Sequence, residues 1–571
     1  MDNFEILRGA SFMNSYTHAS LLDAQQYRIY EFEENKTATV PGYLVVSTAT
    51  LNVEQEVNDT KNLTKPINSQ FFIPKTEQDE TSTKAMLEKI AKYLIESEEP
   101  EIVINIHGYS STPSDTEKGC QKISDYVNRN LKQKNKYLFI GYRWPSENPF
   151  KKDQSGTFKQ KLGYAFNALP ILLAGILSTG LLISIINTLI LLFFHPLSSI
   201  FVHFLTALLV SFGMAFSVIL TLILLRISAY FRDVYRASHY GVLDLVELFR
   251  QLDFTIHKEV KDKRIKLSFI GHSMGCFVVT NAIRTLSDVF DVQSINKVPS
   301  SNIGNVFYLG QLVLVAPDIP VETILPGRAN FLRSSLRRFQ ETYIFCNEGD
   351  LPLRITSTAA NYFSFPAKAR ISGYRLGNIT VSHFTDKNDK IGRVPKYGIV
   401  NLARKDNTDS YTFERPYKHL EIRSSNREHR KLEEMRKFSE TELQPADLFT
   451  YFDCTDYKDD KSKNTGIVSL AIQKSAMNFW DYVSLTFSFT RKTSKNDASG
   501  GVDTHTGYFQ GQFSQQAIYK LAFLGFQGFL NSLAIQDRQE GQIYAFSQEC
   551  QNKQIQVILA PHLYQRTQIN N

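Results

Sequence analysis

Residues 267–283 read LSFIGHSMGCFVVTNAI, and this segment carries the strongest structural signal in the chain. The apolar run that ends at Ile270 has the length of a buried strand, and the residues after Gly275 continue as an apolar, helix-compatible segment. Between them stands Gly271-x-Ser273-x-Gly275, whose glycines relieve crowding in a tight turn that presents a serine. The segment therefore predicts a strand, a sharp turn carrying Ser273, and a helix.

Further apolar runs of strand length lie on both sides of this segment. They cover residues 42–47, 69–73, 101–106, 137–142, 311–316, 342–346 and 448–453. Helical patterns occupy residues 83–96, 115–131 and 230–252. This alternation of strands and helices predicts an α/β fold with a mostly parallel sheet and helices on both faces.

One long segment differs from the rest of the chain in composition. From Leu162 to Leu225 there is no Lys, Arg, Asp or Glu, and His195-Pro196 interrupts the segment near its middle. Two spans of about 20 residues fit there, which is the length needed to cross a hydrocarbon core of about 30 Å. The segment predicts an inserted two-helix transmembrane hairpin, with a buried helical pair in a soluble domain as the alternative.

The charges beside this hairpin predict its orientation. Basic residues flank both of its ends, whereas the short central loop has only His195. The flanking residues are Lys151, Lys152, Lys159, Lys161, Arg226, Arg232 and Arg236. By the positive-inside rule, both termini and the body of the protein are expected in the cytoplasm, with the bilayer as a partner through residues 162–225.

The hairpin falls between two consecutive elements of the predicted sheet domain, so it is expected to be an insertion. The predicted division is 1–160 for the first part of the sheet domain, 161–228 for the hairpin, 229–364 for the central part with Ser273, 365–444 for a polar insertion and 445–571 for the last part. Within the insertion, the charge run 423–437 predicts a solvated helix, with membrane-surface attachment as the alternative.

The overall composition excludes several classes of protein. The 571 residues include 64 Lys and Arg against 57 Asp and Glu, and no dense basic block suggests a nucleic-acid partner. The five cysteines show no CxxC spacing, which argues against a disulfide framework and a structural zinc site and fits a reducing compartment. No metal or organic cofactor is expected.

If Ser273 is a nucleophile, it needs a base, because a hydroxyl is a poor nucleophile at neutral pH. The histidines after it are His383, His419, His429, His505 and His562. His505 is preferred because it lies in a glycine-rich loop, GGVDTHTGYF at 500–509, with His383 as the reserve. His429 lies in the charge run and is expected to be solvated.

A carboxylate must in turn orient that histidine, and two aspartates follow predicted strands. Asp350 follows the strand at 342–346, where the acid of such sites commonly lies, and Asp318 follows the strand at 311–316. Asp350 is preferred and Asp318 is the reserve. The aspartate that is not used is expected to cap a helix or turn.

Acyl transfer also needs donors for the developing oxyanion, worth about 3–4 kcal/mol each. The backbone N–H groups of Met274, which follows the serine, and of Tyr109, which follows His107-Gly108, are the candidates. His107 is expected to shape its loop and His272 to pack the turn, rather than to act as the base.

Seven motifs together resemble a known family. They are IHGY at 106–109, GYRWPS at 141–146, GHSMG at 271–275, LVAPD at 314–318, NEGDLPLR at 347–354, RLGN at 375–378 and THTGYF at 504–509. The set resembles a bacterial group of α/β hydrolases of unknown function, related in outline to lipases and esterases, over residues 40–380 and 445–535 without the hairpin. The resemblance implies Ser273 as nucleophile, Asp350 as acid and His505 as base.

The expected function is therefore that of a membrane-anchored serine hydrolase. It would cleave an ester or related acyl bond, with a lipid as one candidate substrate, through an acyl-Ser273 intermediate and with water as the second substrate. Two alternatives stay open: a non-catalytic membrane scaffold that binds a partner through the same fold, and an acyltransferase with the same triad.

Overall fold

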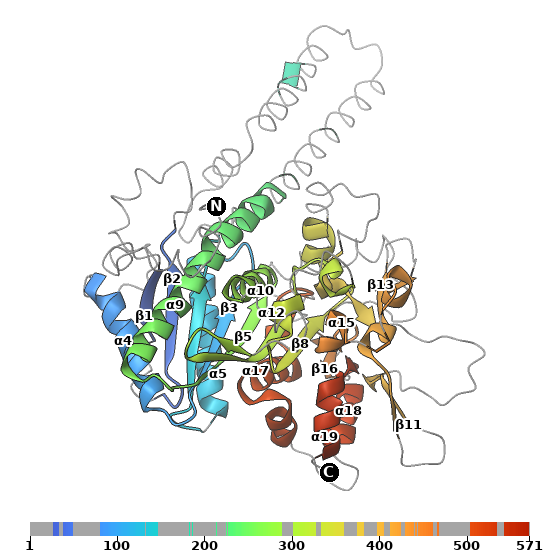
Figure 1. Cartoon of the computed structure of the whole chain (residues 1–571). Helices are drawn as coiled ribbons and strands as arrows, with labels where there is room; N and C mark the ends of the chain where they lie inside the picture. The colour runs from blue at the N-terminus through green and yellow to red at the C-terminus, as the bar shows by residue number, and fades with distance from the viewer. Residues whose placement is uncertain are drawn as a thin grey trace, which may run out of the picture.

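Figure 1 shows the computed structural model of the chain. The structure describes residues 27–32, 38–49, 80–131, 133–146, 227–287, 301–326, 333–358, 374–381, 397–404, 411–423, 429–438, 440–441, 443–460, 465–466, 503–533 and 542–569. The isolated positions 182, 185, 186, 213 and 224 are also described.

A large twisted sheet forms the centre of the molecule, with the strand order β1-β2-β4-β3-β5-β7-β8-β15-β18-β10. Every neighbouring pair from β2 to β15 is parallel, β1 pairs antiparallel at one edge, and β18 pairs antiparallel with β15. The strands are β1 (Tyr27–Glu31), β2 (Gly42–Ser47), β3 (Glu101–Ile106), β4 (Tyr137–Arg143), β5 (Ile265–His272), β7 (Phe307–Val315), β8 (Glu341–Cys346), β15 (Phe449–Asp453), β18 (Gln556–Ile558) and β10 (Gly398–Ile399). A short strand, β6 (Asn302–Ile303), pairs with β7 outside this order.

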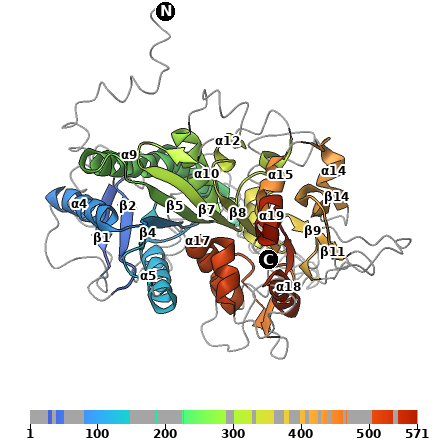
Figure 2. The ribbon, with the colours of Figure 1, turned by 60° about the horizontal axis from the view of Figure 1, so that its bottom comes forward.

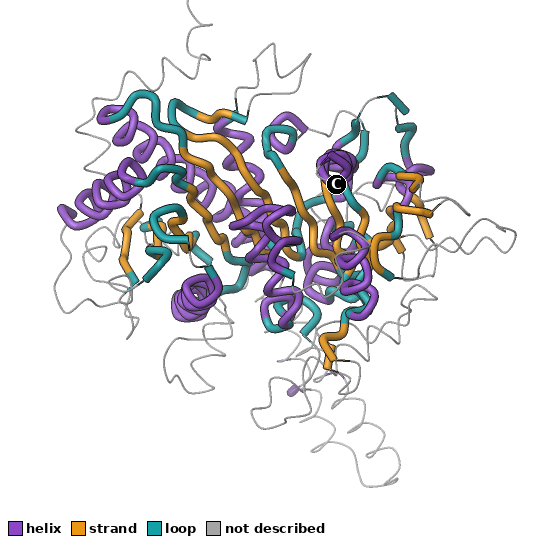
Figure 3. Tube along the Cα trace, turned by 90° about the horizontal axis from the view of Figure 1, so that it is seen from below, coloured by secondary structure: helices purple, strands orange, loops and turns teal. Residues whose placement is uncertain are grey.

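Helices cover both faces of this sheet (Figure 2). One face carries α4 (Glu80–Glu96), α9 (Val242–Glu259) and α10 (Met274–Leu286), and the other carries α5 (Pro113–Asn130), α17 (Gln512–Ser532) and α18 (Gln542–Asn552). Side chains of one strand alternate between the two cores: Ile102 and Ile104 pack with the first group and Val103 with the second. The prediction of a mostly parallel sheet with helices on both faces is confirmed, and Figure 3 shows its strands side by side from below.

The remaining elements are short, except for one long helical segment. Residues 227–236 are helical and continue through a π-helical turn, Ala237–Gly241, into α9. The other helices are α12 (Arg333–Leu336), α14 (Leu432–Met435), α15 (Pro445–Leu448) and α19 (Pro561–Ile569), and short 3-10 or π turns cover Val321–Ile324, Pro352–Ser357, Leu376–Asn378, Pro416–His419 and Gly507–Phe509. The other strands are β9 (Thr380–Val381), β11 (Leu402–Arg404), β12 (Tyr411–Phe413), β13 (Leu420–Arg423), β14 (His429–Lys431), β16 (Lys458–Asp460) and β17 (Thr465–Gly466).

The described part of the charge run differs from the predicted solvated helix. Strand β13 pairs antiparallel with β14 and with β9, and only α14 is helical. Cross-strand pairing places Glu421 opposite Lys431, so opposite charges face each other across the ladder. Leu432, at the start of α14, is fully buried. Strand pairing and the burial of Leu432, rather than helical periodicity, determine the local structure.

Some predicted elements fall on residues that the structure does not describe. These are the strand at 69–73 and the hairpin at 162–225, apart from its five isolated positions. Among the described helices, none combines the length and the apolar character needed to cross a bilayer.

Candidate active site

Ser273 lies on a sharp turn between β5 and α10, as the sequence predicts. Its φ of 54° and ψ of −122° are unusual for a residue with a side chain. A Cβ on Gly275 would lie 2.3 Å from the carbonyl oxygen of Ile106, and a Cβ on Gly271 would lie 2.9 Å from the Cα of Cys276. Both glycines are therefore required where this turn packs against its neighbours.

The Ser273 hydroxyl takes no part in holding the turn together. The main chain does that: Ser273 N donates to the carbonyl of Val315 at 2.9 Å, and Asp318 N donates to the carbonyl of Ser273 at 3.2 Å. The side-chain Oγ is buried and has no hydrogen-bond partner among the described residues. The hydroxyl is therefore available for chemistry.

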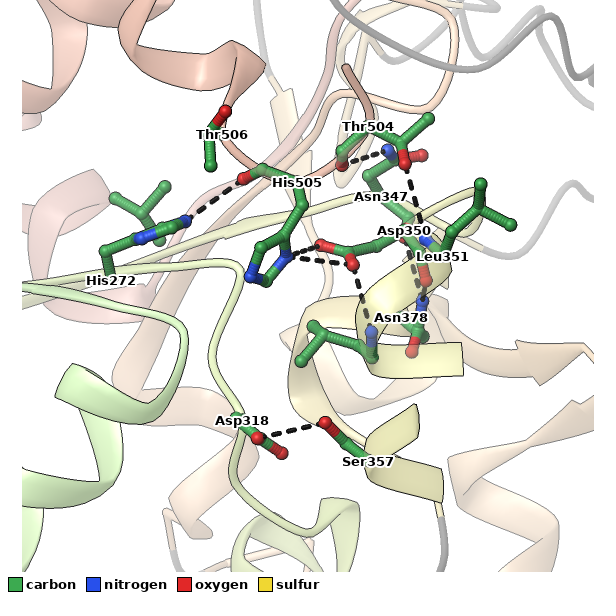
Figure 4. A network of polar contacts seen from close by, with 12 residues as sticks. His272, Asp318, Asn347, Asp350, Leu351, Ser357, Asn378, Thr504, His505 and Thr506 are labelled. Carbon is green, nitrogen blue, oxygen red and sulfur yellow. Dashed lines mark hydrogen bonds and ion pairs between the residues drawn. The ribbon is translucent and has the colours of Figure 1, made fainter. Parts of the chain in front are cut away.

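Asp350 and His505, which are far apart in the sequence, form a close pair (Figure 4). Nδ1 of His505 lies 2.9 Å from Oδ1 and 2.8 Å from Oδ2 of Asp350. Asp350 is fully buried and His505 is 7% exposed. The second ring nitrogen, Nε2, points away from the carboxylate in Figure 4, so the carboxylate orients the ring and leaves Nε2 without a contact to it.

The loops that carry this pair are joined to each other. Asn347 Nδ2 donates to the carbonyl of Thr504 at 3.1 Å, and Leu351 N lies 3.3 Å from the Thr504 hydroxyl. On the other side of the histidine, Oδ1 of Asp503 accepts from the N–H groups of His505 and Thr506 at 3.1 and 2.8 Å. These contacts fix the position of the ring relative to the carboxylate.

The charges around His505 alter its affinity for a proton. Burial lowers the pKa of His505, but the charge and the hydrogen bond of Asp350 outweigh it, with help from Asp503 and Asp318. The pKa therefore lies above the usual 6.5. A histidine held in this way accepts a proton readily, as a general base must.

Asp318, the reserve acid, is engaged elsewhere. It forms a buried ion pair with Arg375, with Oδ1 3.0 Å from Nε, and accepts from the hydroxyls of Ser357 at 3.0 Å and Tyr230 at 3.3 Å. No hydrogen bond joins it to His505 within the described residues. The reserve base His383 lies outside the described residues.

The two candidate oxyanion donors belong to segments close to Ser273. Strands β3 and β5 are neighbours, with Ile106 opposite Gly271, so the loop after β3 and the turn after β5 lie side by side. A Cβ on Gly108 would lie only 2.9 Å from the Cβ of Ser273. Met274 is the first residue of α10, where N–H groups have no intrahelical acceptor. The structure thus brings the Tyr109 loop and the Met274 amide close to the serine.

His107 and His272 have structural contacts. The His107 ring stacks on Trp144 with centroids 5.2 Å apart, and its Nδ1 and Nε2 face the carbonyls of Gly108 and Trp144 at 2.7 and 3.3 Å. His272 Nε2 donates to the carbonyl of His505 at 3.1 Å. Burial is the largest cause that lowers the pKa of each to about 3, so both are neutral.

The contact from His272 to His505 was not predicted from the sequence. It joins the residue before the nucleophile to the main chain of the candidate base, two segments that no local pattern connects. The only signal available was the position of His272 inside the GxSxG motif.

No group of His, Cys, Asp and Glu side chains suited to a metal ion occurs within the described ranges. The five cysteines are buried and unpaired.

The strand order, with a serine turn after β5 and an aspartate after β8, defines the class of α/β hydrolases. Residues 236–390 match a family described as alpha/beta hydrolase of unknown function (DUF900). The match includes Ser273, Asp318 and Asp350 and ends before His505. Fold and match together support placing the chain in the α/β-hydrolase superfamily. No curated protein and no solved structure matches the chain.

Proposed function

We propose that this chain is a serine hydrolase that cleaves an ester or related acyl bond. The observation that carries the proposal is the Asp350–His505 pair, which comes from segments 155 residues apart and lies beside the Ser273 turn. A buried carboxylate that holds Nδ1 of a histidine is the arrangement that a serine nucleophile requires.

In the proposed reaction, His505 Nε2 takes the proton of Ser273 Oγ while Oγ adds to the acyl carbon. The N–H groups of Tyr109 and Met274 stabilise the resulting oxyanion. When the tetrahedral intermediate collapses, the C–O bond to the leaving alcohol breaks and His505 returns the proton to that alcohol. Water then attacks the acyl-Ser273 ester by the same steps, which releases the carboxylic acid and restores the serine.

In this structure the Ser273 hydroxyl has no hydrogen-bond partner among the described residues. Catalytic hydrogen bonds are often long or poorly aligned without substrate and tighten when substrate binds. The proposal therefore needs the Oγ–Nε2 contact to form in the substrate complex.

A fluorophosphonate probe tests the proposal, because it phosphonylates an activated serine. We expect it to label the native chain and Ser273→Ala to abolish both the label and hydrolysis of a p-nitrophenyl ester. Ser287→Ala is the control, because Ser287 follows the other end of α10 and its hydroxyl bonds to the Ile283 carbonyl. Labelling and turnover that persist in Ser273→Ala would show that another residue is the nucleophile and contradict the role of Ser273. A native chain that is neither labelled nor active would contradict the proposal and favour a binding role.

We further propose that residues 162–225 anchor the chain in a bilayer and that the substrate is a lipid or long-chain ester. The absence of charged residues in this segment supports the anchor. Leu182, Ile185 and Ile186 are helical and 46–57% exposed, which does not fit a helical pair buried in protein. The Lys and Arg residues beside the segment favour a cytoplasmic hydrolase domain. The turnover of micellar against soluble esters tests the substrate class.

A further inference from the structure

The loop that carries Tyr109 has a strained backbone. Ser110 has a φ of 56°, in a region that residues with side chains rarely adopt. Such a conformation costs on the order of 1–3 kcal/mol and persists only where the surroundings hold it. The loop therefore needs external support.

Part of the support comes from within the loop. The Gly108 carbonyl accepts from the Ser111 hydroxyl at 3.0 Å and faces His107 Nδ1 at 2.7 Å. The peptide that joins Gly108 to Tyr109 is trans, so the Tyr109 N–H points the opposite way from that carbonyl. The direction of the carbonyl thus fixes the direction of the candidate oxyanion donor.

The rest of the support comes from one buried carboxylate on the helical segment 227–236. Oδ2 of Asp233 accepts from Ser110 N at 3.1 Å and from the Ser146 hydroxyl at 2.8 Å. Ser146 Oγ in turn accepts from Ser111 N at 3.2 Å. Asp233 therefore holds two consecutive N–H groups of the loop, one directly and one through Ser146.

The other oxygen of this carboxylate is held by arginines. Oδ1 of Asp233 lies 3.2 Å from Nη2 of Arg232 and 3.9 Å from Nη1 of Arg236. Asp233 is fully buried, so these charges are poorly screened and the carboxylate has little freedom to turn. The rings of Tyr109 and Tyr230 also form a T-shaped pair, with centroids 5.9 Å apart, and Tyr230 lies one turn before Asp233 on the same helical segment.

We propose that Asp233 is a positioning residue, which holds the 107–111 loop so that the Tyr109 N–H faces the oxyanion formed at Ser273. The inference rests on the proposed function, because it concerns the same acyl transfer. The contacts of Asp233 within the described residues are to Ser110, Ser146 and arginines, not to Ser273. The helical segment 227–236, which carries Asp233, begins just after the uncharged stretch that ends at Leu225. Through Asp233, the 107–111 loop is therefore hydrogen-bonded to the segment that follows this stretch.

The test compares Asp233→Asn with the native full-length chain on a p-nitrophenyl ester. Loss of a single oxyanion donor lowers kcat by about 10²–10³-fold, and a displaced donor should lower it by about 10–100-fold. We expect this fall in kcat with an unchanged KM, because the donor acts on the transition state. An alkyl trifluoromethyl ketone, which forms an oxyanion adduct with the serine, should bind more weakly by the factor lost in kcat/KM.

The chain offers a matched control in Asp253. This α9 aspartate also accepts two loop N–H groups, from Asn305 at 2.8 Å and Val306 at 2.9 Å, but directly before β7 (Phe307–Val315), at the opposite end of the strands from Ser273. Asp253→Asn should leave kcat, KM and ketone affinity unchanged. If Asp233→Asn does not fold, Ser146→Ala removes only the bridging hydroxyl and should lower kcat by about 3–10-fold.

The outcomes separate the two proposals. A native chain that neither labels nor hydrolyses esters would overturn the proposed function and this inference with it. An active native chain whose folded Asp233→Asn and Ser146→Ala variants keep native kcat and ketone affinity would overturn the inference alone. A rise in KM with kcat unchanged would do the same, because it would indicate a substrate-binding role.

Discussion

His505 makes two contacts that serve different purposes. Its side chain is oriented by Asp350, and its main-chain carbonyl accepts from His272, the residue before Ser273. The side chain contact sets which nitrogen carries the proton, and the main-chain contact sets how far the ring lies from the serine turn. Because burial keeps His272 neutral, this second contact does not add a competing charge to the site.

The pKa of His505 predicts how activity depends on pH. As the proposed base, His505 acts only when neutral, and its pKa lies above 6.5 because Asp350 favours the protonated ring. Activity should therefore fall as pH decreases through that pKa. Asp350→Asn removes the charge, so burial dominates and the low-pH limb should move to lower pH. The same change should lower kcat by about 10⁴-fold, since the carboxylate orients the ring.

A pH–rate profile of kcat/KM for the native chain and both aspartate variants checks this assignment. Asp318→Asn leaves the Asp350–His505 pair in place and should retain a limb close to the native one. The roles of the two aspartates would be reversed if Asp318→Asn caused the larger loss and Asp350→Asn kept the native profile.

At the scale of elements, the sequence predicted what depends on short-range patterns. Strand β5, the Ser273 turn and α10 follow from an apolar run, two glycines and a helical continuation, and all three are present. Strands β1, β10 and β18 were not predicted, because they are short and lie at or next to the edges of the sheet, where β10 and β18 pair with residues far away in the chain. The structure of the charge run depends in the same way on pairing between β13 and β14.

In the candidate site, too, the sequence predicted the residues marked by local patterns and missed the contacts made by packing. Ser273, Asp350 and His505 could be chosen because each follows a strand or lies in a distinctive loop, and the structure brings Asp350 and His505 together. The Asp233 contact to Ser110 could not be predicted, because 123 residues separate the two and neither belongs to a motif. Hydrogen bonds of this kind become visible only once the elements are packed.

The packing of the serine turn against β3 predicts a large difference between two glycine substitutions. In Gly275→Ala, the new Cβ would lie 2.3 and 2.5 Å from the carbonyl oxygens of Ile106 and His107, so the turn and the 107–111 loop must separate. We expect a loss of about 1–3 kcal/mol in the free energy of unfolding, and lower activity. Denaturant unfolding measures the first, and ester turnover the second.

Gly119→Ala is the matched control, because its added Cβ meets nothing within 4 Å and Gly119 lies within α5. Alanine in a helix interior should stabilise the chain by roughly 0.5–1 kcal/mol without changing turnover. Equal effects of the two substitutions would show that the close approach at Gly275 is not important.

For the whole molecule, the short stretch of chain between residues 162–225 and the candidate active site bears on the substrate. Tyr230 lies only five residues after Leu225 in the sequence, and its ring contacts Tyr109 while its hydroxyl bonds to Asp318. If residues 162–225 lie in a bilayer, the carboxyl ends of the strands, where Ser273 lies, are near the bilayer surface. Long acyl chains are concentrated at that surface.

This arrangement predicts a preference for aggregated esters. The full chain in detergent or vesicles should hydrolyse long-chain esters in micelles or bilayers faster than short soluble esters, because the apolar segment keeps the site at the surface that holds the substrate. A variant with residues 162–225 replaced by a short Gly/Ser linker should retain turnover of the short ester and lose the preference, which separates anchoring from catalysis. Faster turnover of soluble esters by the full chain would argue against a lipid substrate while leaving the roles of Ser273, Asp350 and His505 intact.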